Sequence, residues 1–144
     1  MSIYVLLQVA YLAALAGAGV VAVKYGDWPE RAGVGLIVGG SILTVPASVI
    51  PGLNGPTALG ILAVDAVVLV AFLYLVLKTD RFWPLWACGF HLVGVATHLA
   101  TLSHPDIVPL AYKLVRGAWA YPMLAAIVLA VLNPLTATGR TGSA

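Results

Sequence analysis

Charged residues are scarce in this chain: only 8% of its 144 residues are Asp, Glu, Lys or Arg, whereas 62% are hydrophobic. Soluble domains are typically about 25% charged and about 45–50% apolar. A globule of this length cannot hide so much apolar surface from water, so we expect a lipid bilayer around the chain. The formal net charge is only +2, and there is no basic run, which argues against nucleic acid as a partner.

Cysteine and catalytic motifs are also nearly absent. The single cysteine, Cys88, excludes an intrachain disulfide and a cysteine-only metal cluster. No serine lies in a G-x-S-x-G elbow, and no glycine pattern is typical of a phosphate or dinucleotide site. We therefore expect a protein that is not an enzyme and that has no metal site.

Long apolar segments are present instead, and five of them follow one another along the chain. A helix rises about 1.5 Å per residue and needs roughly 20 residues to cross the hydrocarbon layer. The sequence thus predicts an all-α integral membrane protein: one compact bundle of five transmembrane helices within residues 1–134, and a flexible tail at 135–144. The predicted spans are 3–23, 31–50, 57–77, 82–103 and 117–132.

Turn signals separate these spans. Asp27 is typical of a helix N-cap, Pro29 suits a first turn, and Glu30 has the position of the reciprocal partner in a capping box. The Pro- and Gly-rich residues 51–56 end the second span. Residues 107–116 alternate apolar and basic positions at helical spacing, which is typical of a helix lying in the membrane interface. Four spans plus such an interfacial helix is the alternative architecture.

Lysine and arginine are distributed unevenly between the two predicted ends of the bundle. One end receives Lys24, Arg31, Lys78, Arg81 and Arg140, and the other receives Lys113 and Arg116. Cytoplasmic loops carry an excess of these residues. The sequence therefore predicts a multi-pass protein of a bacterial-type inner (cytoplasmic) membrane, with its N-terminus outside and its C-terminus in the cytoplasm.

Small residues recur four positions apart in two of the predicted spans. Ala13 and Gly17 form one pair, and Gly35 and Gly39 form the other. In lipid, such pairs allow helix backbones to approach closely. We expect these faces to pack inside the bundle; self-association of the chain is the alternative.

All three histidines, His91, His98 and His104, fall within the fourth span or at its end. Ionisable groups inside a membrane are costly and mark candidate functional sites. His91 and His98 are seven residues apart, which puts them on one face and about 10.5 Å apart along a helix. They cannot clasp one haem between them, although single ligation stays open, and their spacing fits no zinc signature.

Helix geometry places polar side chains from four spans in the outer half of the bundle. At about 1.5 Å per residue, several of them lie roughly 8–12 Å from the outer face. The members of this predicted buried polar cluster are Asp65, His98, His91, Gln8, Thr44 and Ser41. A lone aspartate at mid-membrane costs about 2.5–3.5 kcal/mol, so we expect Asp65 to face His98 across the third and fourth helices.

Three functions fit these patterns. The first is a non-enzymatic accessory or interaction subunit of a larger membrane complex, without a cofactor, because nearly the whole chain is span or short turn. The second is a proton-linked small-solute transporter or channel, with Asp65 and His98 as a titrating pair and a helix break at Pro46. The third is a quinone- or haem-binding electron-transfer subunit that uses His91, His98 and Asp65. The lack of a soluble part favours the first.

Overall fold

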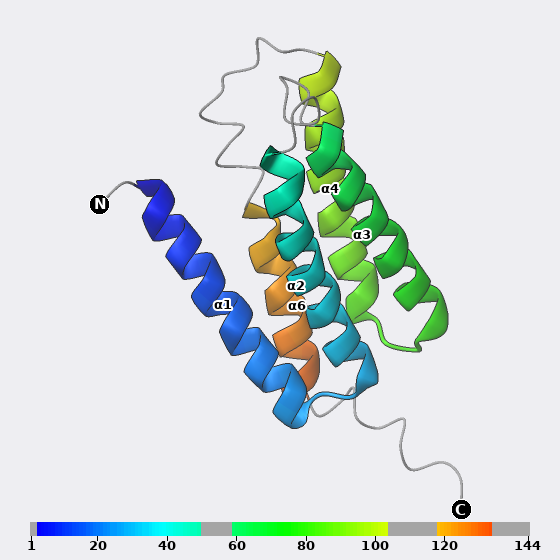
Figure 1. Cartoon of the computed structure of the whole chain (residues 1–144). Coiled ribbons are helices and arrows are strands. Elements are labelled where there is room, and N and C mark those ends of the chain that lie inside the picture. Colours follow the sequence, from blue (N-terminus) through cyan, green and yellow to red (C-terminus); the bar gives the residue numbers. More distant parts are fainter. Residues whose placement is uncertain (1–2, 50–58, 104–117, 134–144) are drawn as a thin grey trace, which may run out of the picture.

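The computed structural model describes residues 3–49, 59–103 and 118–133, which form five helices and no strand (Figure 1). The helices are α1 (Ile3–Tyr25), α2 (Trp28–Val49), α3 (Leu59–Lys78), α4 (Trp83–Ser103) and α6 (Ala120–Leu132). The predicted all-helical bundle is confirmed. The linker at 51–56, the predicted interfacial helix at 107–116, His104 and the tail at 135–144 lie outside the described residues.

The helices form a closed ring in which neighbours follow the order α1, α2, α3, α4, α6 and back to α1. Helix α2 also contacts α6 across the ring. The end of α1, the start of α2, the end of α3 and the start of α4 lie together at one end of the bundle (Figure 1). We call this the charged end, and its ionisable residues are Lys24, Asp27, Glu30, Arg31, Lys78, Asp80 and Arg81.

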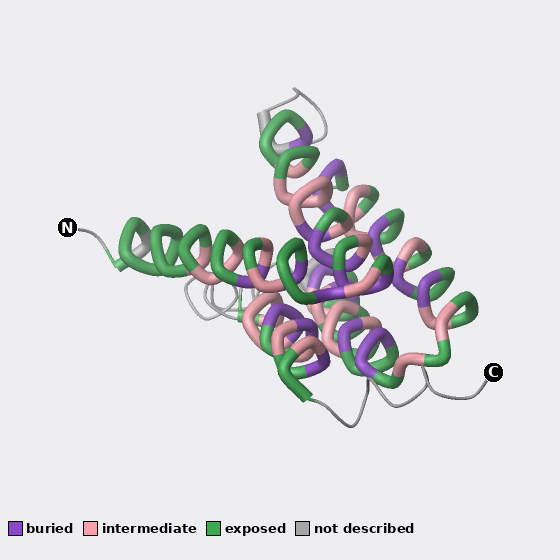
Figure 2. The backbone as a smooth tube through the Cα atoms, turned by 90° about the horizontal axis from the view of Figure 1, so that it is seen from below, coloured by how far each residue is buried: buried purple, intermediate pink, exposed green. Residues whose placement is uncertain are grey.

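The core brings all five helices together around a few fully buried side chains. Phe72 of α3, Ala87 of α4 and Ile127 of α6 have no exposed surface. Helix α1 joins this core through Ala18 and Ala22 in its second half. Its first half leans away from α2 and is exposed (Figures 1 and 2).

Large apolar residues remain exposed on all five helices, and Figure 2 shows that the exposed positions lie along the outer sides of the backbone. Val9 of α1, Val45 of α2, Val70 of α3, Leu99 of α4 and Leu129 of α6 are each at least half exposed. Among the described helices, Val5–Tyr25 and Leu59–Lys78 are long and apolar enough to cross a membrane. All five helices thus keep exposed apolar residues outside the buried core.

The small-residue pairs do not pack inside the bundle, so this prediction is wrong. A Cβ atom added at Gly17, Gly35 or Gly39 would meet no atom within 4 Å, and Ala13 is exposed. The reason is rotational position on the helix. The buried stripe of α2 passes through other residues at helical spacing, and the predicted pair lies on the outward side.

Two other glycines of α2 make the close approaches. An added Cβ at Gly33 would collide with the indole ring of Trp83, and one at Gly40 would lie 2.9 Å from Val68 Cγ2. Gly33 thus lets the first residue of α4 pack against the backbone of α2. A four-residue spacing alone does not single out these two positions.

Candidate functional site

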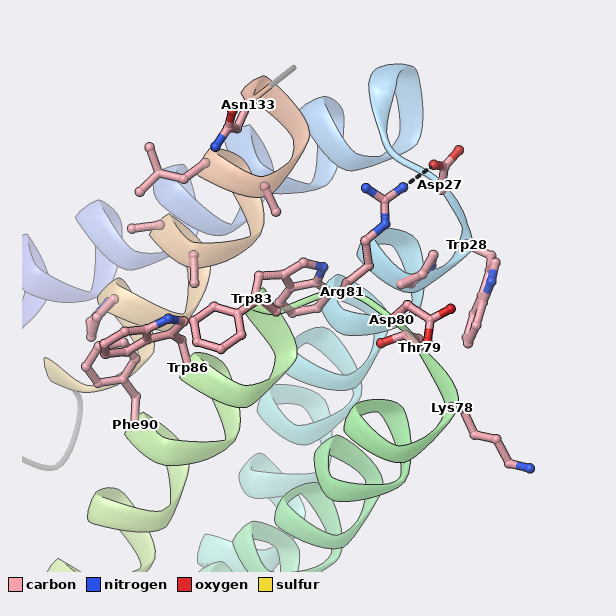
Figure 3. A pocket seen from close by; sticks show the side chains of 17 residues that line it. Asp27, Trp28, Lys78, Thr79, Asp80, Arg81, Trp83, Trp86, Phe90 and Asn133 are labelled. Atoms are coloured by element: carbon pink, nitrogen blue, oxygen red, sulfur yellow. Dashed lines mark hydrogen bonds and ion pairs between the residues drawn. The ribbon is translucent and has the colours of Figure 1, made fainter. Parts of the chain in front are cut away.

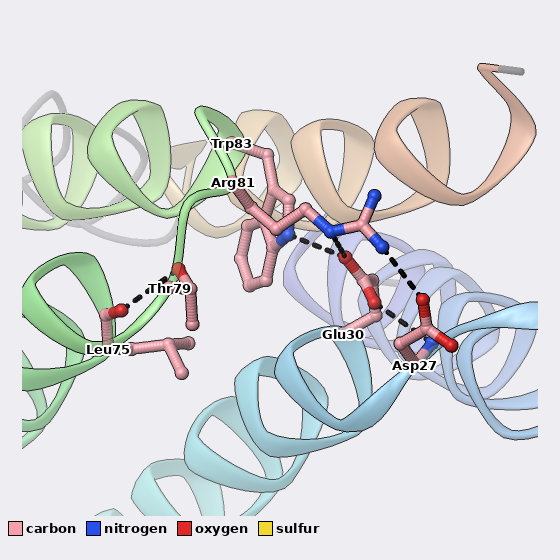
Figure 4. Close-up of polar contacts among 6 residues, drawn as sticks. All are labelled: Asp27, Glu30, Leu75, Thr79, Arg81 and Trp83. Carbon is pink, nitrogen blue, oxygen red and sulfur yellow. Dashed lines mark hydrogen bonds and ion pairs between the residues drawn. The ribbon is translucent and has the colours of Figure 1, made fainter. Parts of the chain in front are cut away.

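Glu30 makes the reciprocal bond of a capping box at the start of α2, at the charged end. The backbone N–H of Asp27 donates to Glu30 Oε2 at 2.9 Å, as predicted from the spacing of these residues. The other carboxylate oxygen of Glu30, Oε1, accepts a hydrogen bond from Trp83 Nε1 at 2.8 Å and lies 4.0 Å from Arg81 Nε (Figure 4). Glu30 is only 2% exposed. Both of its oxygens therefore have partners where water is largely excluded.

Arg81 binds the same turn through its guanidinium group. Its Nη2 atom is 2.7 Å from Asp27 Oδ2, and the side chains of the pair are 23% and 34% exposed (Figure 4). Arg81 comes from the connection between α3 and α4, and Trp83 begins α4. Two carboxylates at the start of α2 thus hold the connection and the beginning of the next helix.

Sequence reasoning found the capping box but missed these long-range contacts. A local signal exists for the box, because its two residues are three positions apart. Arg81 lies 54 positions from its partner Asp27, and Trp83 lies 53 positions from its partner Glu30. The available signal was topological: two turns were predicted on the same side of the bundle, one with two carboxylates and one with Arg81 two residues before Trp83.

Asp65 of α3 contacts both described histidines of α4. His98 Nε2 lies 3.0 Å from Asp65 Oδ2, so the predicted contact is present, and His98 is 4% exposed. His91 Nε2 lies 2.9 Å from the main-chain carbonyl oxygen of Asp65. A carbonyl can only accept, so this nitrogen carries the proton.

Helix direction explains how one residue reaches two histidines. Side chains tilt toward the N-terminus of their helix, and carbonyl groups point toward its C-terminus. The Asp65 carboxylate therefore reaches toward one end of the bundle and its carbonyl toward the other. On the neighbouring α4, His98 and His91 lie at those two levels.

The other predicted members of the polar cluster do not join Asp65. Ser41 Oγ donates to a carbonyl one turn earlier in α2 and accepts from Tyr11 Oη at 2.6 Å, on the side facing α1. Thr44 Oγ1 donates to the carbonyl of Gly40 at 2.8 Å, within its own helix. Gln8 is exposed on the first half of α1, which leans away from α2. Equal depth did not bring these residues together, since they point to different faces.

Both described histidines use Nε2 to contact α3. Over the described ranges, no group of three His, Cys, Asp or Glu side chains could hold a metal ion. Nε2 of each histidine is directed at Asp65, so haem ligation through that atom would first break the α3–α4 contact. The predicted break at Pro46 is also wrong: α2 continues through it to Val49.

A cavity of about 1170 Å³ opens at the charged end, beside α4 and α6 (Figure 3). Trp86 and Phe90 of α4 form an aromatic wall, with ring centroids 6.2 Å apart and planes inclined by 30°. Helix α6 lines the cavity with small side chains that include Ala125 and Ala126. The polar lining consists mainly of Asp27, Lys78, Asp80, Arg81 and Asn133. The cavity is therefore amphipathic.

No protein-family model matches this chain, and no curated protein and no solved structure is significantly similar to it. The function therefore has to be inferred from the geometry of these sites and from the surface around them.

Proposed function

We propose that this protein is an integral membrane protein whose five helices lie in lipid, and that it is a non-enzymatic subunit that packs against another membrane-embedded chain. The exposed apolar surface carries the proposal. Monomeric soluble proteins rarely expose contiguous apolar patches larger than a few hundred Å². Here exposed Val or Leu residues occur on every one of the five described helices. Lipid tails shield such a surface from water, so its exposure carries no hydrophobic penalty.

The outward small-residue pairs support the subunit role. Gly17 of α1 and the pair Gly35 and Gly39 of α2 have open space where a Cβ would be. Small residues on an outer face allow the backbone of a second helix to approach closely in lipid. Since the bundle itself does not fill these faces, we assign them to a contact with another chain, either a larger assembly or a second copy.

The Asp65 site supports a structural role for the buried polar groups. Both histidines bond α3 through Nε2, which fixes the register between α3 and α4. A transport pathway or a haem would need these same groups, and the helix break that transport sites often use is not at Pro46.

The charges support one orientation. Four basic residues of the charged end, Lys24, Arg31, Lys78 and Arg81, belong to the turns that join α1 to α2 and α3 to α4 or flank them. We therefore place the charged end on the cytoplasmic side of a bacterial-type inner membrane, with the N-terminus outside.

Crosslinking in native membranes tests the subunit role. Cys88 is the only cysteine, so Cys88→Ala gives a background for single introduced thiols. We expect Gly35→Cys to form a crosslinked adduct with a defined neighbour, and Val70→Cys on the lipid-facing side of α3 to form none. Equal adducts at both positions, or adducts at neither, would contradict the proposed interface.

Alkaline carbonate extraction tests membrane integration separately. An integral protein stays in the pellet, whereas release of the full chain into the supernatant would refute the membrane assignment itself. The distribution of a known integral protein and a known peripheral protein in the same preparation serves as the control.

A further inference from the structure

The amphipathic cavity beside α4 and α6 has an apolar part that suits a hydrocarbon chain. Trp86 and Phe90 supply a stacked aromatic wall, and Ala125, Ala126 and Leu129 of α6 also line it. The short alanine side chains leave room opposite the aromatic rings. A volume of about 1170 Å³ is at or above the upper end of ordinary small-molecule pockets, which are about 300–1,000 Å³. It therefore has room for a headgroup and the first part of an acyl chain.

The rim of the cavity carries both signs of charge in equal number. Its bases are Lys78 and Arg81, and its acids are Asp27 and Asp80. Arg81 and Asp27 pair at 2.7 Å, while Lys78 Nζ lies 5.7 Å from the ring centroid of Tyr74. A purely anionic ligand would meet the two carboxylates, and a purely cationic one would meet the two bases. A ligand with one charge of each sign fits this rim best.

We propose that this cavity binds one phospholipid whose headgroup carries a phosphate and a primary ammonium, the chemistry of phosphatidylethanolamine. The phosphate lies toward Arg81, because Lys78 is directed away from Arg81 and from the aromatic wall (Figure 3), and the ammonium donates toward Asp27 and Asp80. The acyl chain lies between the aromatic wall and α6. This inference rests on the proposed membrane location, because the lipid enters from the surrounding bilayer.

The headgroup chemistry separates this lipid from its common alternatives. A choline headgroup has no N–H donor for the carboxylates, and a glycerol headgroup carries no positive charge. Trp28 and Trp86 are both exposed beside the cavity, and tryptophan is enriched at the level of lipid headgroups. The rim thus lies at the depth where a headgroup is found.

Native mass spectrometry of the full chain in detergent tests the inference, with equal amounts of phosphatidylethanolamine, phosphatidylcholine and phosphatidylglycerol added. We expect a single bound phosphatidylethanolamine to be retained preferentially. Ala126→Leu extends into the acyl-chain space and should weaken retention about tenfold, in keeping with the cost of overfilling a packed site. Ala10→Leu, on the exposed first half of α1, adds the same volume elsewhere and should retain lipid like the parent.

The exposed rim residue Asp80 gives a second test that leaves the packing unchanged. Asp80→Asn should reduce the preference for phosphatidylethanolamine over phosphatidylcholine about two- to fivefold, the size of a partly exposed charge contact. Equal retention of the three lipids, a preference for phosphatidylglycerol, or full retention by Ala126→Leu would overturn the inference. A chain that stays in the carbonate pellet and yet has no headgroup preference refutes this site alone, whereas release from the pellet refutes the membrane location.

Discussion

The charged end and the Asp65 site both use carboxylates to join helices, but they distribute their contacts differently. At the charged end, Glu30 caps α2, accepts from Trp83 and lies near Arg81, so one side chain joins three segments. At the Asp65 site, the side chain contacts His98 among the described residues, and the contact with His91 uses the main-chain carbonyl. A substitution can remove all contacts of Glu30, but it can remove only half of those of Asp65. Stability should therefore depend more on the charged end.

Replacing Glu30 should have the largest effect. Glu30→Ala removes the acceptor of the buried Trp83 N–H and the reciprocal cap of α2. Breaking one partner out of a buried polar set costs about 3–5 kcal/mol. SDS-induced unfolding in mixed micelles, followed by circular dichroism, would measure this loss. Glu30→Gln keeps an acceptor oxygen for Trp83 and should lose markedly less.

The reverse order would contradict this ranking of the two regions. If Asp65→Ala lowers the free energy of unfolding more than Glu30→Ala, the bundle depends more on the α3–α4 contact than on the charged end. Trp83→Phe is a useful companion, because it removes the N–H group while keeping most of the buried ring.

The glycines of α2 give the next effect, which extends the comparison from side chains to backbone packing. Gly33→Ala places a methyl group against the Trp83 ring and should cost about 1–3 kcal/mol. In the isolated chain, Gly35→Ala meets open space and should be neutral or should stabilise the helix by about 0.5–1 kcal/mol. The same unfolding assay compares them, and equal effects at the two positions would show that Trp83 does not pack against Gly33.

Two double-mutant cycles test the contacts of Asp65 with His98 and with His91. Asp65→Ala with His98→Ala should show a coupling of about 0.6–1.7 kcal/mol, the range of polar contacts between membrane helices. Asp65→Ala with His91→Ala should be additive within about 0.3–0.5 kcal/mol, because alanine keeps the carbonyl that His91 contacts. Strong coupling in the second cycle would mean that His91 also interacts with the Asp65 carboxylate.

The features that could be predicted from the sequence are those that depend on distance along a helix. Apolar runs located the five helices, the three-residue spacing of Asp27 and Glu30 gave the capping box, and depth placed Asp65 level with His98. Each of these depends on rise per residue and on chain direction, and both can be read from a single sequence.

The features that the sequence did not predict depend on rotation about the helix axis and on tilt. Gly35 and Gly39 have the spacing of a packing pair, yet the buried face of α2 is the one that carries Gly33 and Gly40. Gln8 has the right depth but is exposed on the first half of α1, which leans away from α2. Because the helices are apolar nearly all round, hydrophobic periodicity gives no signal for which side faces inward.

The contact between Tyr11 and Ser41 should be the weakest of the polar contacts between helices. Ser41 already donates to a carbonyl of its own helix, so the Ser41 hydroxyl stays hydrogen-bonded in Tyr11→Phe. The expected loss is below about 0.6 kcal/mol, the average for such contacts in a membrane protein, and the same unfolding assay applies. Tyr11 also packs edge-on against Tyr121, at a centroid distance of 6.2 Å, and phenylalanine keeps that ring. If Tyr11→Phe lowers the free energy of unfolding as much as Asp65→Ala does, the α1–α2 contact is as important as the α3–α4 contact. The Tyr11 hydroxyl would then be a main attachment of the first half of α1 to the bundle.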